Sequence, residues 1–158
     1  MARKIDTVFV LALITLFAAT SFILVLIGAK QYRFVTDVMD ENYKSRTTSS
    51  YLMEKIRQND TSLNQRISIE TFDGYEALTI SQTINNTLYH TYIYEAEGEL
   101  KELFIQDAIS ASADFGTTIL EIGHLEMNEI SDGLFQFICT STDGSTDSVT
   151  ISTRSYIH

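Results

Sequence analysis

The sequence contains no proline and no tryptophan, and it has one cysteine and seven glycines among 158 residues. The absence of proline argues against a Pro-rich linker or tail. The single Cys139 excludes an internal disulfide, and a lone thiol in a core behaves as a small apolar side chain. No internal repeat of roughly 20 to 50 residues is found. The length allows one domain and little else.

Basic residues are scarce in the second part of the chain. Residues 67–158 hold only Lys101 and Arg154 against fifteen carboxylates, whereas residues 1–66 hold nine basic and six acidic side chains. The formal net charge of the chain is −10. A chain this acidic repels the phosphate backbone, so we expect no nucleic acid among its partners.

One long run of apolar residues lies near the N-terminus. From Val8 to Ala29 the chain has 22 residues without a charge. As a helix this run is about 33 Å long, which is enough to cross the hydrocarbon core of a bilayer. The alternative is a cleaved secretory signal with a weak cleavage site at residues 17–19. The run is longer than the apolar core of such signals, roughly 7 to 15 residues, so we expect a retained membrane anchor.

The orientation of this anchor follows less directly from the charges. Basic residues lie on both sides of the run: Arg3 and Lys4 precede it, and Lys30, Arg33, Lys44 and Arg46 follow it. A short basic N-terminus that leads directly into a span usually stays inside, and the acidic, Thr- and Ser-rich remainder suits an outer surface. We therefore expect a single-pass protein of the cell membrane with a cytoplasmic N-terminus and an extracytoplasmic C-terminal domain.

Three residues in or beside the span are candidates for contacts between subunits. Thr15 and Ala19 form one small-xxx-small pair, a spacing found where membrane helices pack together. The hydroxyls of Thr15 and Thr20 can return to backbone carbonyls one turn back. Asp6 lies two positions before the uncharged run, where a carboxylate needs a partner. Either Asp6 pairs with nearby basic residues at headgroup level, or it contacts a neighbouring subunit.

Residues 30–60 contain neither glycine nor proline, so the membrane helix can continue outward as an amphipathic stalk. A helix from Val8 to Asn59 would be about 78 Å long. One stripe of apolar or small residues follows a 3,4 spacing on this helix: Val35, Val38, Asn42, Ser45, Ser49, Leu52 and Ile56. Because the stripe is most apolar at its end, we expect Leu52 and Ile56 to dock on the following domain. Residues 47–50 are poor helix formers, which makes them the predicted place for a kink or a frayed turn.

After Asp60 the hydrophobic period changes to that of strands. Alternating, aromatic or β-branched residues predict strands at 67–71, 78–80, 89–94, 100–105, 119–127, 134–140 and 149–154. Dipeptides that tolerate positive φ separate them: Asp73-Gly74, Asn85-Asn86, Glu97-Gly98, Asp132-Gly133 and Asp143-Gly144. A short helix or loop is expected within residues 106–116. The pattern predicts consecutive antiparallel hairpins in one sheet of about five to seven strands.

Together these elements predict an α+β fold with three parts. Residues 1–29 form a cytoplasmic stub and transmembrane helix, residues 30–60 an amphipathic helical stalk, and residues 61–158 an antiparallel β-sheet head. A long helix packed on such a sheet resembles the architecture of a type IV pilin, in which hydrophobic helices bundle in the centre of a filament. A helix of this kind leaves the bilayer only if neighbouring helices replace the lipid around it.

The aromatic residues of the predicted sheet are interpreted as core. Tyr89, Tyr92, Tyr94 and Phe104 could form an exposed binding ladder, but the sheet needs apolar side chains against the helix. We therefore expect most of them to pack against the C-terminal end of the stalk.

No residue pattern indicates a catalytic or cofactor site. His90 and His124 share no metal-ligand spacing with other His, Cys or carboxylate residues, so cross-strand packing is expected for both. There is no Gly-x-Ser-x-Gly turn and no Gly-rich phosphate loop. We expect no catalytic residue, no metal, no cofactor and no small-molecule substrate, and we interpret the protein as non-enzymatic.

Two clusters of oxygen ligands are candidates for calcium binding. They are Glu95, Glu97 and Glu99, and Asp143, Ser145 and Asp147. Neither fits the twelve-residue calcium loop, so solvated turn charge is the preferred interpretation.

Several segments carry a resemblance to a known family: DTVFVLALITLFAATSFILVLIGAK (Asp6 to Lys30), RTTSSYLMEKIRQND (Arg46 to Asp60), TYIYEAEGELKELF (Thr91 to Phe104) and the closing TRS. Over nearly its whole length the chain resembles a family of small membrane-anchored proteins catalogued as domain of unknown function 4860. Members look like pilin-related proteins of Gram-positive bacteria, encoded beside type II secretion or type IV pilus components. The segment 116–137 is also similar to the last strands of minor pseudopilins.

The resemblance implies a membrane-anchored, pilin-like minor subunit or assembly and priming component of a type IV pilus or type II secretion-like machine. Its implied partners are other pilin-like subunits, inner assembly platform proteins and the membrane. A prepilin carries a processing glycine before its span, whereas no glycine precedes Gly28 here, so a fixed membrane component is favoured. The alternative is a solitary membrane-tethered extracytoplasmic binding or sensing domain.

Overall fold

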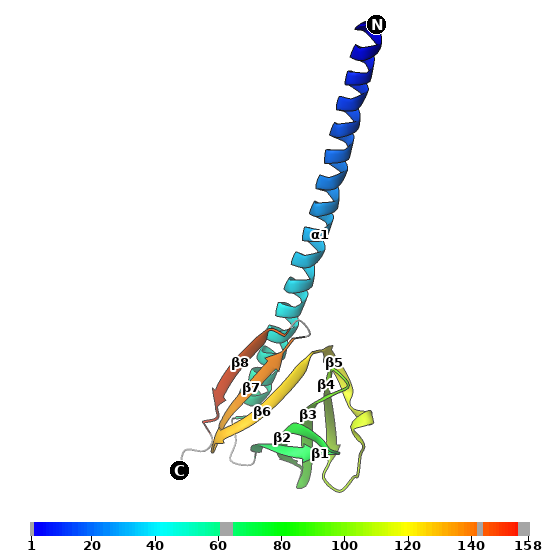
Figure 1. Cartoon of the computed structure of the whole chain (residues 1–158). Coiled ribbons are helices and arrows are strands. Elements are labelled where there is room, and N and C mark those ends of the chain that lie inside the picture. Colours follow the sequence, from blue (N-terminus) through cyan, green and yellow to red (C-terminus); the bar gives the residue numbers. More distant parts are fainter. Residues whose placement is uncertain (1, 61–64, 142–143, 155–158) are drawn as a thin grey trace. The chain divides into compact units, whose positions relative to one another are not determined.

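The computed structural model describes residues 2–60, 65–141 and 144–154, with the side chains of residues 2–6 and 40–42 left out (Figure 1). One long helix, α1 (Ala2–Asn59), precedes all of the strands. The chain forms two compact units, residues 1–40 and residues 41–158. The last turns of α1 therefore belong to the same unit as the strands.

Helix α1 passes without interruption through residues 47–50, the poor helix formers of the stalk. The hydroxyl of Thr48 donates to the backbone carbonyl of Lys44 at 2.9 Å, so its hydrogen-bonding group has a partner within the helix. Thr48 is fully buried and Ser49 nearly so. Packing against the strands outweighs the weak helix propensity of these small residues.

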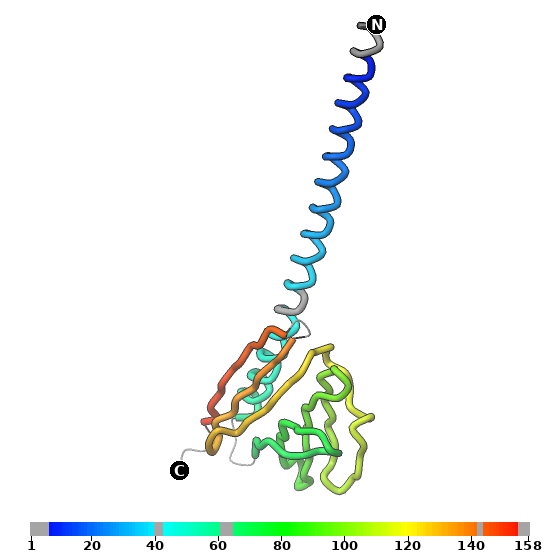
Figure 2. Tube along the Cα trace, viewed as in Figure 1, coloured from blue at the N-terminus to red at the C-terminus, as the bar shows by residue number. Residues whose placement is uncertain are grey.

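In the part of the chain that the structure describes, eight strands form two antiparallel sheets in which neighbours follow chain order. The path of the chain through them can be followed in Figure 2. The first sheet contains β1 (Gln65–Phe72), β2 (Tyr75–Ile84), β3 (Thr87–Ala96), β4 (Glu99–Gln106) and β5 (Thr117–Glu121). The second contains β6 (His124–Ser131), β7 (Leu134–Thr140) and β8 (Thr146–Ser152). A short 3-10 helix, η1 (Ala113–Phe115), lies between β4 and β5. The α+β layout with an antiparallel sheet is confirmed, and it is compatible with a pilin-like fold.

The expectation of a single sheet was wrong, and so was the single strand expected over residues 119–127. That run is divided into β5 and β6, which belong to different sheets. At the division, a Cβ on Gly123 would overlap the carbonyl oxygen of Thr140 and the backbone of Ser141. The chain therefore changes sheets where only glycine permits so close an approach of two backbones.

The predicted turns are confirmed where the structure describes both residues, whereas Asp143 of the last predicted turn lies outside the described residues. Both residues of Asp73-Gly74, Asn85-Asn86 and Glu97-Gly98 have positive φ, between 48° and 86°. Two consecutive residues with positive φ make the two-residue hairpin turns whose twist matches that of the strands. These turns fix the register of the first four strands.

The main core lies between the end of α1 and both sheets. Leu52 and Ile56 are fully buried there, as predicted for the docking end of the stalk. Their partners come from seven strands: Ile67, Leu78, Ile80, Ile93, Leu100, Leu125, Met127, Phe135, Phe137, Cys139 and Ile151. Burying a Leu or Ile side chain of this kind contributes roughly 1.5–3 kcal/mol.

The aromatic residues of the first sheet do not pack as expected. Tyr94 is fully buried, but it joins a second cluster with Ala77, Ala96 and Ala113 on the sheet face opposite the main core. Phe104 is 51% exposed and stacks on Tyr89. Only alternate residues of β3 face α1, so a run of aromatic residues cannot all pack on one side.

Candidate functional site

The N-terminal part of α1 presents an uncovered apolar surface. Every large apolar side chain from Val8 to Ile27 is between 54% and 71% exposed. The most apolar 18-residue window has a mean hydropathy of 2.8, and none of it is buried by the rest of the described chain. This helix is long and apolar enough to cross a membrane, which is consistent with single-pass anchoring.

The residues predicted for assembly lie in different parts of the structure. The hydroxyl of Thr15 donates to the carbonyl of Ala12 at 2.9 Å, which confirms its expected backbone partner, and Ala19 is exposed on the same helix. The side chain of Asp6 lies outside the described residues. Leu52 and Ile56 make their contacts inside the chain's own core.

Exposed aromatic residues follow the span. Tyr32 is 75% exposed and Phe34 is 63% exposed. Aromatic side chains gather at membrane interfaces, where one end meets apolar and the other polar surroundings. The sequence pattern that would have predicted this pair is the position of aromatic residues directly after the apolar run.

A carboxylate of the first sheet holds the docked end of α1. Glu102 on β4 accepts hydrogen bonds from the hydroxyl of Tyr51 and from Lys55 Nζ, the latter at 2.7 Å. The Lys55 ammonium also lies 5.3 Å from the centroid of the Tyr51 ring. Burial, and then the hydrogen bond and charge of Glu102, raise the pKa of Tyr51 well above its usual value.

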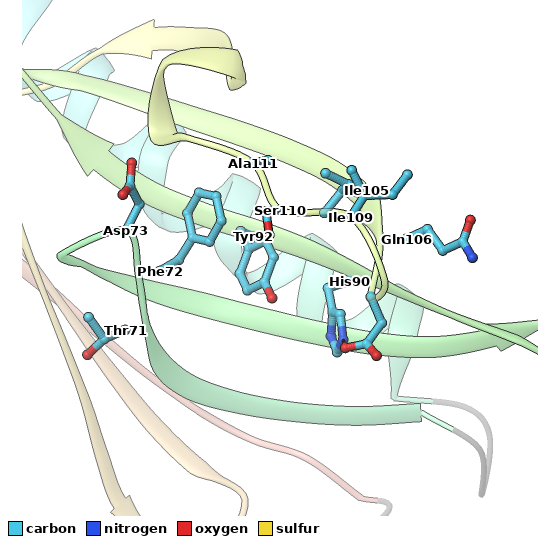
Figure 3. A pocket seen from close by; sticks show the side chains of 11 residues that line it. Thr71, Phe72, Asp73, His90, Tyr92, Ile105, Gln106, Ile109, Ser110 and Ala111 are labelled. Atoms are coloured by element: carbon cyan, nitrogen blue, oxygen red, sulfur yellow. Dashed lines mark hydrogen bonds and ion pairs between the residues drawn. The ribbon is translucent and has the colours of Figure 1, made fainter.

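A cavity of about 290 Å³ opens on the sheet face opposite the main core (Figure 3). Its floor includes Phe72 from β1 and His90 and Tyr92 from β3. Its other side is formed by Ile105 and by the segment of residues 107–116, here called the covering segment. The Phe72 and Tyr92 rings stack with their centroids 4.2 Å apart.

Three side chains beside this cavity form a hydrogen-bonded chain. The Ser81 hydroxyl lies 2.9 Å from His90 Nδ1, and His90 Nε2 lies 2.9 Å from Asp107 Oδ1. The neutral imidazole tautomer with its proton on Nε2 satisfies both contacts, because it donates to Asp107 and accepts from Ser81. The cross-strand position expected for His90 is confirmed, and its ring also stacks on Tyr92.

The order hydroxyl, imidazole, carboxylate is that of an activated serine nucleophile. In this chain the arrangement differs from that of a serine nucleophile in two respects. Ser81 lies in the middle of β2, paired with Arg66 on one side and His90 on the other, so its backbone is engaged in the sheet. Ser81 is also not among the described residues that line the cavity. The chain of hydrogen bonds therefore positions the His90 ring and Asp107 at the cavity rim.

Further contacts hold the covering segment on the sheet. The backbone N–H of Asp107 donates to the carbonyl of Leu88 at 3.0 Å. Asp73 Oδ2 accepts from the backbone N–H of Ala113 at 2.8 Å, and the Tyr94 hydroxyl donates to the Ala113 carbonyl at 2.5 Å. Burial raises the pKa of Tyr94, so its hydroxyl remains a donor. The segment is thus fixed at both ends, with the cavity between.

His124 is 70% exposed at its side chain, so the expected cross-strand packing was wrong for this residue. Its Nδ1 lies 2.8 Å from Glu95 Oε2 on the other sheet. Two other carboxylates considered for calcium also have protein partners: Glu99 accepts from Thr118, and Asp147 accepts from Ser49. Asp143 lies outside the described residues.

The Ser81 and His90 pair could have been found from the sequence. The two-residue turn at Asn85-Asn86 places Ser81 directly opposite His90 across the hairpin. The position of Asp107 depends on how the covering segment folds back, which no local pattern indicates.

Comparison with protein families places most of the chain in one family. The family described as "Domain of unknown function (DUF4860)" matches residues 43–142. The chain belongs to this family. The part that matches DUF4860 begins within α1 and contains the docked helix end, the first sheet, the cavity and most of the second sheet. No curated protein and no solved structure matches the chain.

Proposed function

We propose that this DUF4860 protein is a membrane-anchored, pilin-like minor subunit or an assembly and priming component of a type IV pilus or type II secretion-like machine. The observation that carries the proposal is the uncovered apolar surface of α1 over residues 8–27. Such a surface requires lipid or other apolar helices around it, because water solvates it poorly. The combination of this helix with an antiparallel head supports the pilin-like interpretation.

In this proposal the apolar helix is the part that binds other subunits. Thr15 and Ala19 supply the small surface on which a neighbouring helix can approach closely. The N-terminus lies in the cytoplasm and residues 41–158 lie outside the cell membrane. The partners are other pilin-like subunits and the inner platform proteins of the machine, and no catalysis is required of the chain.

Cysteine crosslinking in native membranes tests the helix contact. Ala19→Cys places a thiol on the small-residue side of α1, and Phe17→Cys places one on the opposite side as a matched control. We expect Ala19→Cys to crosslink to a protein with a similar apolar helix and Phe17→Cys to remain uncrosslinked. Equal crosslinking at both positions, or none at either, would contradict a specific subunit contact.

A membrane-impermeant maleimide tests the orientation in intact cells. Phe115 is 72% exposed, so a Phe115→Cys variant presents an accessible thiol on the head. Cys139 is only 5% exposed, so the parent chain serves as the unlabelled control. Labelling of Phe115→Cys in intact cells is expected, whereas labelling only after lysis would place the head in the cytoplasm.

A solitary membrane-tethered binding domain is the second candidate. The cavity beneath the covering segment favours it, because a filament subunit that acts only through its helix needs no such cavity. Absence of crosslinks at Ala19 together with ligand binding at the cavity would favour this candidate over the first.

A further inference from the structure

The cavity beneath the covering segment has the size of a site for one side chain or a small molecule. Its volume of about 290 Å³ is just below the range for small-molecule sites, roughly 300–1,000 Å³. Figure 3 shows side chains from the sheet and from the covering segment around the same space. A large ligand would have to displace the covering segment, which is fixed at both ends.

One part of the cavity wall is apolar and can contact an aliphatic stem. Phe72 and Tyr92 stack as one aromatic surface, and Ile105 and Ile109 lie among the lining residues. Ile109 is 56% exposed, so a ligand that covers it would remove apolar surface from water. Thr71, Asp73, Gln106 and Ser110 also line the cavity, so it offers an apolar side for a CH₂ chain and polar groups for a charged end.

The charged groups at the cavity are acidic. Asp73 and Asp107 both line it, and no lysine or arginine is among its described lining residues. In their hydrogen bonds within the described chain, Asp73 uses only Oδ2 and Asp107 only Oδ1, which leaves the second oxygen of each for a ligand.

The surrounding sheet adds to this negative field. Residues 65–121 contain ten carboxylates against two basic residues, Arg66 and Lys101. Lys101 Nζ lies 3.5 Å from Glu99, and Arg66 lies on β1 in the same cross-strand row as Ser81 and His90, so the carboxylates remain in large excess. Tyr92 in the cavity wall responds to these charges: burial, and then the negative charges of Glu70 and Asp107, raise its pKa. Such a field attracts cations.

We propose that this cavity binds a primary ammonium or guanidinium group carried on an aliphatic stem, as in a lysine or arginine side chain of a partner polypeptide. Asp107 makes the ionic contact, and Phe72, Tyr92 and Ile109 contact the stem. The proposal does not depend on the membrane anchoring or on the pilin-like role. A free alkylamine presents the same chemistry, so the test includes both sources.

The test is a titration of the full chain in detergent micelles, followed by NMR of the ring protons of His90 and Tyr92. The probes are acetyl-Gly-Lys-Gly-amide, the same peptide with uncharged norleucine, the same peptide with glutamate, and n-butylamine. We expect the lysine peptide to shift the ring signals saturably and the norleucine and glutamate peptides to have little effect. Saturation by n-butylamine at the same concentration would identify a free amine as a sufficient ligand, and a response to the lysine peptide alone would identify a polypeptide source.

Two variants assign the binding to the cavity. Asp107→Asn should lower the affinity for the lysine peptide about tenfold, because one charge-assisted contact is lost. Ala111→Leu fills the cavity without altering a carboxylate and should abolish the shifts of the ring signals. The test therefore remains valid even if Asp107→Asn displaces the covering segment from the sheet. The control, Asp132→Asn, removes one charge at the β6–β7 turn and should change the affinity less than about twofold.

Three results would overturn the proposal. Equal binding of the lysine and norleucine peptides would show that the cavity does not select a cation. A loss in Asp132→Asn equal to that in Asp107→Asn would show general attraction to an acidic protein. No saturable shift with either amine would show that the cavity is not a site for them.

Discussion

Glu76 on β2 accepts a hydrogen bond at its Oε2 atom from the backbone N–H of Met127 on β6, at 3.0 Å. Glu95 on β3 does the same for the backbone N–H of Leu125, at 2.8 Å. Since β6 is an edge strand of its sheet, these carboxylates satisfy backbone donors that would otherwise be open to another strand. The two sheets are therefore joined by side chains of one and backbone groups of the other.

Glu95→Ala should destabilise the head because it removes the acceptor shared by Leu125 and His124. Hydrogen bonds to charged groups contribute about 1.5–3 kcal/mol, and the loss should fall in that range. Urea unfolding in detergent, followed by circular dichroism, measures the free energy of unfolding, and amide exchange should accelerate at Leu125. Glu126→Ala, on the exposed side of β6, is the matched control and should change stability by less than about 0.5 kcal/mol.

Gly123→Ala should destabilise the head because its new methyl group would overlap the carbonyl oxygen of Thr140. Overpacking of this kind costs about 1–3 kcal/mol. Gly28→Ala is the control, since no atom lies within 4 Å of a Cβ at that position. An unchanged free energy of unfolding for Gly123→Ala would show that the link between the sheets is not tightly packed.

Leu52→Ala and Ile56→Ala should each lower the free energy of unfolding of the head by about 2–5 kcal/mol, because each leaves a cavity in the main core. Met39→Ala changes a helix side chain that is 66% exposed and should leave head unfolding nearly unaltered. The same urea titration measures all three. Equal losses at Leu52 and Met39 would contradict the docking of the helix end.

Stability should fall as the pH rises above about 10, because the pKa of Tyr51 is raised in the folded chain. Below that pH the hydroxyl is protonated in both states, and the stabilisation is complete. At higher pH the unfolded chain releases the proton first, which favours unfolding.

Tyr51→Phe tests this assignment. The variant should lose about 1 kcal/mol at about pH 8, where the hydrogen bond to Glu102 is intact. The difference from the parent chain should shrink at about pH 11. A difference that stays constant between these two pH values would show that Tyr51 does not titrate with unfolding.

The sequence was sufficient for the elements that depend on local pattern. Helix α1 ends at Asn59 as expected, since the residues before it contain no helix breaker and the stripe through Leu52 and Ile56 has helical spacing. The hairpins follow from their turn dipeptides. The division between β5 and β6 could not be predicted, because residues 119–127 retain a strand pattern across Gly123 and the reason for the break is a backbone from elsewhere in the chain. The contact between Asp107 and His90 could not be predicted either, because it depends on how the covering segment folds back over the sheet.

The order of strands in each sheet has a consequence for how the chain acquires its structure. Every strand pairs only with the strand before or after it, so each hairpin can form from contacts that are close in sequence. We expect the hairpins to form early in folding. Long-range steps remain for last: the seating of the helix end against both sheets and the closing of the carboxylate links at β6. Until those steps are complete, the open side of β6 is where an incompletely folded copy is most exposed to mispairing with another.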